Sequence, residues 1–229
     1  MCIRDSRCKD KLKKRDNIIT VAIDSPAAAG AGTQAKLIAE NYNLFYLDTG
    51  KIYRFLGKLK LDNEKRFSYS LIKSKINNLR LSYLKSRSLL SNEVALSASK
   101  IAKDKKIRDI VHKFQQKCAY NPPKKFGGSV LDGRDIITVQ VKDAMFKFYI
   151  TANLNVRVKR RFYEYKKLNK KITYMEVFKT LKNRDKSDKN RKYGPLKKTK
   201  DSILINTTKL SKKACFKKIK DIMDKKLNN

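Results

Sequence analysis

An apolar run, a turn of very small residues and a helical pattern follow one another near the start of the chain, and this succession most constrains the fold. Residues 17–23 read NIITVAI, a short stretch rich in β-branched residues that predicts a buried strand. The turn DSPAAAGAGT (24–33) consists mainly of alanine and glycine. Residues 33–42, TQAKLIAENY, then predict a helix with Leu37 and Ile38 on its inner side. Strand, tight turn and helix in this order predict the opening unit of an α/β domain.

The alternation of strands and helices continues along the chain. Further strands are predicted at residues 44–47, 129–133, 145–152 and 202–208, and further helices at 50–59, 94–119, 154–168, 173–184 and 211–226. Residues 58–95 are rich in Lys and Ser without a sheet pattern and are expected to form a small mobile insertion, whereas residues 185–200 are expected to form a charged loop. Alternation of this kind implies βαβ crossovers and a parallel sheet, in which ligands bind beyond the carboxyl ends of the strands.

The turn after the first strand has the setting of a phosphate-binding loop. Small residues allow backbone N–H groups to curl around a phosphate, and the start of the following helix favours negative charge. Thr33 places a hydroxyl where such loops hold magnesium. However, Ser25 stands in place of the first glycine and Ala31 in place of the lysine of the full signature. An alanine-rich helix entry therefore remains an alternative interpretation of this motif.

Polar residues also follow the second predicted strand. Asp48 and Thr49 lie at its end in LDTGKIYR (47–54), and Arg54 lies one turn into the next helix. The fork of an arginine can hold a phosphate through two parallel hydrogen bonds. A solvated arginine at a helix start is the alternative.

Two further clusters combine arginine with aspartate. In DGRD (132–135), Asp132 occupies the place of a carboxylate that orients hydrated magnesium, although a hairpin turn would also explain the motif. In NRDKSDKNR (183–191), helical spacing places Arg184, Asp188 and Arg191 on one face. A surface ladder of ion pairs is the alternative there.

The charge balance bears on possible partners. The 229 residues carry 57 Lys and Arg against 21 Asp and Glu, a formal net charge of +36. A nucleic-acid partner would explain this charge, but lysine is spread from Lys9 to Lys226 rather than concentrated on one segment. We therefore favour a general compositional bias, with a field that attracts phosphate-bearing substrates.

Cysteine usage and hydropathy indicate a reduced, cytoplasmic setting without a membrane segment. The four cysteines lie at scattered positions, none in C-x-x-C spacing, and the chain has one histidine, which argues against a structural zinc site. No apolar stretch approaches the roughly 20 residues that a membrane helix needs. Residues 1–16, MCIRDSRCKDKLKKRD, lack the apolar middle of a signal peptide and are excluded from the fold as a disordered basic tail. The first six of them resemble a translated sequencing adaptor, so an artefactual origin of the tail is an alternative.

From about Ile18 to Lys226, the four clusters together resemble the bacterial cytidylate kinases. The family pattern I-D-G-P-S-G-A-G-K-G-T, L-D-[ST]-G-x-x-Y-R, D-G-R-D, R-D-x-x-D-x-x-R and a final D-[ST]-T corresponds here to IDSPAAAGAGT, LDTGKIYR, DGRD, RDKSDKNR and INTT, in the same order. The resemblance implies a three-layer α/β/α phosphate-loop kinase. Its core would span residues 17–57 and 96–229, with a mobile lid at 183–197 and a shortened monophosphate-binding insertion at 58–95.

The resemblance also implies an activity and a role for each matching residue. A monomeric kinase would transfer the γ-phosphoryl group of ATP to CMP or dCMP, with Mg²⁺. The residues implied in catalysis are Asp132, Arg134, Arg184 and Arg191. The residues implied in ATP binding are Ala28, Ala29, Gly30, Ala31, Gly32 and Thr33, with Thr33 and Asp132 as magnesium ligands. The residues implied in CMP binding are Thr49, Arg54, Ser99, Arg108, Arg134, Asp135, Arg184, Asp188 and Arg191, among which Ser99, Arg108 and Asp135 would read the cytosine.

Several departures from the family pattern leave other functions open. Leu90 and Ser187 replace arginines, Asn206 replaces the last aspartate, and Ala31 replaces the lysine that bridges the β- and γ-phosphates. Lys36 lies five residues beyond Ala31 and would reach back only if the helix began differently, while Arg160 and Arg161 offer partial compensation. An active kinase is the leading hypothesis. A nucleotide-binding pseudokinase and a basic RNA-associated protein are the alternatives.

Overall fold

The sheet of this protein is parallel throughout and carries five strands. The computed structural model describes residues 18–168 and 171–228, so the N-terminal tail predicted at 1–16 lies outside the described residues. Strands β1 (Ile19–Asp24), β2 (Phe45–Asp48), β3 (Gly128–Gly133), β4 (Phe146–Thr151) and β5 (Ile203–Asn206) are arranged in the order β2-β3-β1-β4-β5. Every pairing is parallel, which confirms the α/β fold predicted from the alternation of strands and helices.

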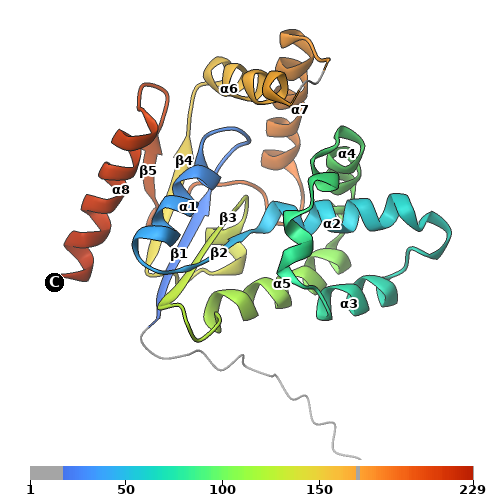
Figure 1. Ribbon diagram of the computed structural model, residues 1–229, viewed down its shortest axis with the longest axis horizontal. Coiled ribbons are helices and arrows are strands. Elements are labelled where there is room, and N and C mark those ends of the chain that lie inside the picture. Colours follow the sequence, from blue (N-terminus) through green and yellow to red (C-terminus); the bar gives the residue numbers. More distant parts are fainter. Residues whose placement is uncertain (1–17, 169–170, 229) are drawn as a thin grey trace, which may run out of the picture.

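Helices cover both faces of this sheet (Figure 1). Because successive side chains of a strand point to opposite faces, Ala22 of β1 packs with α2 (Thr49–Asp62), α3 (Tyr69–Asn77) and α5 (Lys105–Tyr120), whereas Val21 and Ile23 pack with α1 (Ala31–Asn41) and α8 (Lys212–Leu227). Fully buried aliphatic side chains fill both cores, and Phe146 and Phe148 join those of the second. Burial on both faces explains why the predicted strands read as continuous apolar runs, and it confirms the three-layer arrangement.

The segment between β2 and β3 is helical and packs on one side of the sheet. After α2 it contains the short turns η1 (Glu64–Arg66), η2 (Leu81–Lys85) and η3 (Arg87–Leu90) around α3, followed by α4 (Asn92–Ile101). The single helix predicted at 94–119 is wrong, because α4 ends at Ile101 and α5 begins anew at Lys105. Asp104 caps α5, since its carboxylate accepts a hydrogen bond from the Ile107 amide at 3.0 Å.

Helices α2 and α4 cross closely at a glycine. A side-chain carbon at Gly57 would come within 2.8 Å of backbone atoms of Val94 and Ala98, so only glycine permits this approach. The hydroxyl of Ser97 donates to the Gly57 carbonyl at 3.1 Å across the contact. This crossing brings α4 against the helix that follows β2, at the carboxyl edge of the sheet.

Helices α6 (Leu154–Lys167) and α7 (Tyr174–Asn190) form a separate hairpin above that edge (Figure 1). Val158, Val177 and Leu181 make its small apolar core. The charged loop predicted at 185–200 is wrong in its first part, because α7 continues to Asn190. Asp185 explains the continuation: its carboxylate receives two hydrogen bonds from Arg157 of α6, at 3.1 and 2.6 Å, which hold the charged last turns against the neighbouring helix.

Most other element boundaries differ from the prediction by one to three residues at each end. Within the described part of the chain, none of the helices has the length and apolar character needed to cross a membrane.

Candidate functional site

A cavity of about 460 Å³ lies at the carboxyl edge of the sheet, where β1, β2 and β3 end. It is bounded by the turn after β1, by α2, α4 and α5, and by the α6–α7 hairpin. All residues assigned to a site from sequence line this one cavity: Ala28, Ala29, Gly30, Ala31, Gly32, Thr33, Thr49, Arg54, Ser99, Arg108, Asp132, Arg134, Asp135, Arg184, Asp188 and Arg191. The fold therefore brings together residues from strand ends that are more than a hundred positions apart.

The turn after β1 curls as a phosphate loop does. Ala28 and Gly30 both have positive φ, 61° and 96°, and α1 begins directly afterwards at Ala31. Two carbonyls of the turn are engaged from other elements: Arg157 donates to the Ala27 carbonyl at 3.2 Å, and the Thr207 hydroxyl donates to the Ala29 carbonyl at 2.8 Å. A turn in which residues of positive and negative φ alternate, followed by the start of a helix, directs its backbone amides into a concave site that suits an anion.

Two carboxylates stand beside this turn. Asp48 ends β2, and Asp132 lies next to it in the paired strand β3. Burial first, and the Asp48 carboxylate second, raise the pKa of Asp132 to about 7 from its ordinary 3.8. The Cα of Gly32 faces them, since a side-chain carbon there would lie 3.5 Å from Oδ2 of Asp132 and 3.4 Å from the Tyr46 hydroxyl. Glycine thus keeps the acidic pair open to the phosphate loop.

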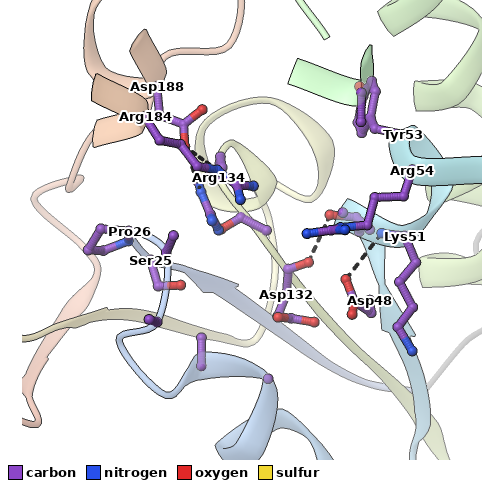
Figure 2. A pocket seen from close by; sticks show the side chains of 18 of the residues that line it. Ser25, Pro26, Asp48, Lys51, Tyr53, Arg54, Asp132, Arg134, Arg184 and Asp188 are labelled. Atoms are coloured by element: carbon purple, nitrogen blue, oxygen red, sulfur yellow. Dashed lines mark hydrogen bonds and ion pairs between the residues drawn. The ribbon is translucent and has the colours of Figure 1, made fainter. Parts of the chain in front are cut away.

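Arginines gather on the opposite side of the cavity around one carboxylate. Arg134 donates from Nε to Oδ2 of Asp188 at 2.9 Å, and Arg184 lies 3.8 Å from the same oxygen, at i,i+4 spacing on α7. Figure 2 shows Arg54 reaching in from the side of α2, opposite Arg184 and Asp188. Burial and then the neighbouring Arg134 lower the pKa of Arg184 to about 10. Positive charge therefore exceeds what Asp188 can neutralise, and the cluster is prepared for an anion.

A second ion-paired group closes the far end of the cavity. Arg108 of α5 is hydrogen-bonded to the carboxylate of Asp135, and Arg191 lies 3.7 Å from the other oxygen of that carboxylate. Gly194 lies against the Arg108–Asp135 pair with φ of 56°, and any side chain there would overlap both partners. Ser99 of α4 also lines the cavity. This end offers both acceptors and donors of hydrogen bonds.

Three buried polar atoms of the cavity wall have no hydrogen-bond partner within residues 18–168 and 171–228. They are the Tyr53 hydroxyl, Nη2 of Arg191 and Oδ1 of Asp132. Buried polar groups are nearly always hydrogen-bonded, so these atoms indicate a polar ligand. Tyr53 was not assigned to the site from sequence, although it stands directly before Arg54 in the LDTGKIYR motif. Its position in that motif was the available signal.

Comparison with known proteins agrees with this arrangement. A family model described as cytidylate kinase matches residues 21–225. The chain belongs to the cytidylate kinase family. A protein named cytidylate kinase from Clostridium botulinum (strain Okra / Type B1) is 36% identical over 218 residues, which cover 90% of this chain and 98% of that protein. Another of that name from Bartonella tribocorum (strain CIP 105476 / IBS 506) is 41% identical over 202 residues, covering 86% and 90%.

Among solved structures, an uncharacterized protein from Eubacterium ventriosum ATCC 27560 has a TM-score of 0.50 and 17% identity, over 90% of this chain and 98% of that one. This likeness concerns the fold alone. The family match confirms the resemblance read from the motifs and the expectation of a kinase, and nothing in the comparisons favours a pseudokinase.

The residues in which this cytidylate kinase family member departs from the family pattern also meet the site. Ala31, Leu90 and Ser187 line the cavity. Ala31 is the first residue of α1, and its methyl group supplies no cation to the cavity. Asn206 ends β5, where its side-chain oxygen accepts a hydrogen bond from the Thr208 amide at 3.0 Å and shapes the turn toward Thr207.

Lys36 also lines the cavity. The helix that carries it, α1, begins at Ala31, two residues before the predicted start at Thr33. Its ammonium group acts electrostatically on Asp132, lowering the pKa of that carboxyl against the larger effect of burial. A cation one turn into α1 thus stands near the acidic pair.

Proposed function

We propose that this protein transfers the γ-phosphoryl group of ATP to CMP or dCMP, giving ADP and CDP or dCDP. The observation that carries the proposal is the convergence of three different parts in one cavity. A phosphate loop lies beside two carboxylates, an arginine cluster surrounds Asp188, and the Arg108–Asp135 pair lies beyond them. These parts suit, in turn, a triphosphate, a monophosphate and a hydrogen-bonding base.

The donor nucleotide would bind at the turn after β1. Residues 28–33 would wrap the phosphates with backbone amides, which needs small side chains and positive φ more than it needs charge. Arg160 supports the loop from outside: it donates to the Thr207 hydroxyl at 2.9 Å and to the Thr207 carbonyl at 2.7 Å. Because Ala31 replaces the lysine of the signature, the loop carries less positive charge. We expect this loss to reduce the rate of transfer rather than to abolish ATP binding.

The residues beside the loop fit a magnesium ion. Asp132 offers a buried oxygen without a hydrogen-bond partner among the described residues, and Thr33 offers a hydroxyl on the same cavity wall. In the described part of the chain, no three His, Cys, Asp or Glu side chains converge as a metal cage. Magnesium is commonly held by one or two carboxylates together with substrate phosphates, so this donor set suits it. When bound, the ion would neutralise charge on the β- and γ-phosphates.

The acceptor monophosphate would lie among Arg54, Arg134 and Arg191, with Arg184 toward the transferring group. Arg54 is already oriented, because its Nη1 donates to the Leu89 carbonyl at 2.8 Å. Burial first, and the nearby Arg161 next, lower the pKa of Arg54. Crowded, partly desolvated guanidinium groups stabilise negative charge that develops during transfer more strongly than solvated ones do.

The base and the sugar would be read at the far end of the cavity. The Asp135 carboxylate would accept from the exocyclic amino group of cytosine, and Arg108 and Ser99 would meet the ring acceptors. Thr49 lines the same cavity, and its hydroxyl donates to the Asp132 carbonyl at 2.8 Å. Arg184 and Asp188 would contact the ribose.

In the transfer step, an oxygen of the acceptor monophosphate forms a bond to the γ-phosphorus while the bond from that phosphorus to the β–γ bridging oxygen breaks. ADP leaves with the electron pair of the broken bond. No protein group needs to form a covalent bond, so the residues above act by positioning the reactants and by balancing charge. Closure of residues 183–197 over the nucleotides would exclude water.

The test is a coupled assay of the purified protein with ATP, magnesium and CMP, with UMP and AMP as alternative acceptors. We expect CDP to form, with CMP preferred over UMP. CMP binding without turnover would contradict the proposal and support a pseudokinase. We further propose that the enzyme acts in the cytoplasm, because Cys118 and Cys215 are free thiols, as expected in a reducing compartment, and burial raises the pKa of Cys118 to about 12. That it acts as a monomer is a separate part of this proposal, which the oligomeric state in solution tests.

A further inference from the structure

Asp24 is a fully buried carboxylate that none of the roles above uses. It is the last residue of β1, directly before the phosphate loop, and its side chain has no exposed surface. Its Oδ1 accepts from the Ile136 amide at 2.8 Å, and its Oδ2 accepts from the Ile137 amide at 3.0 Å. Burial raises the pKa of Asp24 to about 7, against the effect of these two hydrogen bonds. Burial of a carboxylate costs free energy unless hydrogen bonds compensate it, so the two amides that Asp24 binds explain its presence here.

Those amides begin a short π-helical segment, η4 (Ile136–Gln140), in which the first N–H groups have no partner inside the segment. Such amides are ordinarily satisfied by the side chain of the residue just before the helix. Here that residue is Asp135, and its side chain makes no capping hydrogen bond. Asp24, 112 positions away in sequence, takes the capping role instead.

The Asp135 carboxylate is thereby left free to face the cavity. Instead of turning back to the first amides of η4, it meets Arg108 and Arg191, and the side chain of Gln140, the last residue of η4, donates to it at 3.3 Å. Aspartate is one of the residues best suited to cap the helical segment that follows it, so the carboxylate of Asp135 could itself bind these amides. Without Asp24, the Ile136 and Ile137 amides would compete for the same carboxylate.

Asp24 also fixes the position of the turn that carries Asp135. Asp24 pairs in register with Gly133 of β3, and the Ser25 amide donates to the Gly133 carbonyl at 3.1 Å. A side-chain carbon at Gly133 would come within 2.9 Å of Ile136, so turn and η4 are in tight contact. The side chain of Asp24 therefore helps to set the position of the base-reading carboxylate through this turn.

We propose that Asp24 is a positioning residue for base recognition: by capping η4 from the neighbouring strand, it keeps the Asp135 carboxylate directed at the nucleobase. The proposal rests on the proposed function, in which Asp135 accepts from the amino group of cytosine. It predicts that loss of Asp24 weakens acceptor binding and discrimination between CMP and UMP, while donor binding changes little.

The experiment compares Asp24→Ala and Asp24→Asn with Ser129→Ala. Alanine removes both acceptors, whereas asparagine keeps one and turns a donor toward the second amide. Ser129 is a matched control, because it is equally buried in β3 and its hydroxyl donates to the Ala119 carbonyl at 2.7 Å, away from the cavity. For each protein, kcat and KM are measured for CMP, UMP and ATP, together with the melting temperature.

In Asp24→Ala we expect the KM for CMP to rise about tenfold or more, and the CMP-to-UMP ratio of kcat/KM to fall by a similar factor. The KM for ATP should change by less than about threefold. Asp24→Asn should show a smaller change in the same direction, and it serves as the test if the alanine variant does not fold. Ser129→Ala should lower the melting temperature without moving the selectivity ratio.

An unchanged selectivity ratio in either folded Asp24 variant would overturn the proposal, because a merely structural role would lower stability alone. An equal rise of the KM values for CMP and ATP would overturn it as well. Failure of the proposed function is distinguishable, since it would already appear as absent CDP formation by the wild-type protein. In that event, calorimetric binding of CMP and UMP to wild type and variants decides on Asp24.

Discussion

Nε of Arg134 lies 2.9 Å from Oδ2 of Asp188, which joins the turn after β3 to the end of α7. The same carboxylate lies 3.8 Å from Arg184 and 3.6 Å from Arg191. One largely buried aspartate thus holds three guanidinium groups that would otherwise repel one another. Its position explains how the cavity keeps an excess of positive charge without a bound ligand.

Replacing Asp188 by asparagine should therefore weaken both the fold and the acceptor site. The three arginines lose their shared counter-charge, and removal of one partner from a buried charged group costs about 3–5 kcal/mol at most. We expect a lower melting temperature and a KM for CMP that rises about 10- to 100-fold, measured by steady-state kinetics. Asp201→Asn is the control, because its pair with Lys147 is exposed on the aspartate side and should matter little. Equal effects of the two variants would contradict this interpretation.

Asp132→Asn should separate stability from activity. The carboxyl pKa is raised to about 7 from 3.8, so the native protein retains a proton that the unfolded chain releases, and the free energy of unfolding falls as pH rises through that window. Asp24 contributes in the same direction. The asparagine variant removes the contribution of Asp132 and should melt at a higher temperature than wild type at pH 8, by about 2–4 °C for each kcal/mol.

The same variant should lose about 10²–10³ in kcat, because the proposed role of Asp132 needs its charge. In wild type, kcat/KM, which reports ionisation of the free enzyme, should fall below about pH 7 as Asp132 becomes protonated. Calorimetric scans and pH–rate profiles measure both effects. Asp62→Asn, at an exposed i,i+4 pair with Lys58, is the control and should alter neither. A stabilised variant that keeps wild-type activity would contradict the proposed role of Asp132 in transfer.

Ala31→Lys should raise the rate of transfer. A lysine at the start of α1 would supply the charge that the phosphate loop lacks, and single preorganised donors of this kind contribute about 10²–10³ in kcat. We expect a gain below that range, about tenfold, because the existing arginines and Lys36 supply part of the charge. The contribution of Lys36 to this charge is tested with Lys36→Met in the wild-type protein and in the Ala31→Lys variant. The control is Lys217→Met, on the exposed face of α8. No gain from Ala31→Lys would mean that the charge of the loop is already replaced.

Ala28→Gly should stabilise the phosphate loop. Ala28 has φ of 61°, a conformation that disfavours residues with a Cβ, and the family pattern has glycine at this position. Relief of about 1 kcal/mol would raise the melting temperature by about 2–4 °C, whereas Ala29→Gly, at a residue outside the positive-φ region, should lower it. A lower melting temperature for Ala28→Gly would show that the loop is not strained.

The sequence by itself determined the fold class, the existence of the strands and the set of motif residues at their ends. These features depend on local patterns: apolar runs for strands buried on both faces, small residues where the backbone turns tightly, and short motifs that stay together along the chain. Because parallel strands bring their carboxyl ends to one edge, the motifs were bound to meet once the alternation was recognised.

Other features were decided only by the tertiary structure, because contacts between elements that are distant in the sequence stabilise them. Local composition predicted a loop from residue 185, but Arg157 and Arg134 bind Asp185 and Asp188 and extend α7 to Asn190. Tyr53 lies within a motif of the sequence, but only the structure shows that its buried hydroxyl has no partner among the described residues. The capping of η4 by Asp24 spans 112 positions and leaves no periodicity in the sequence. A hydrogen bond from the turn after β3 to the end of β1 depends on the register of these two strands and on nothing in the chain between them.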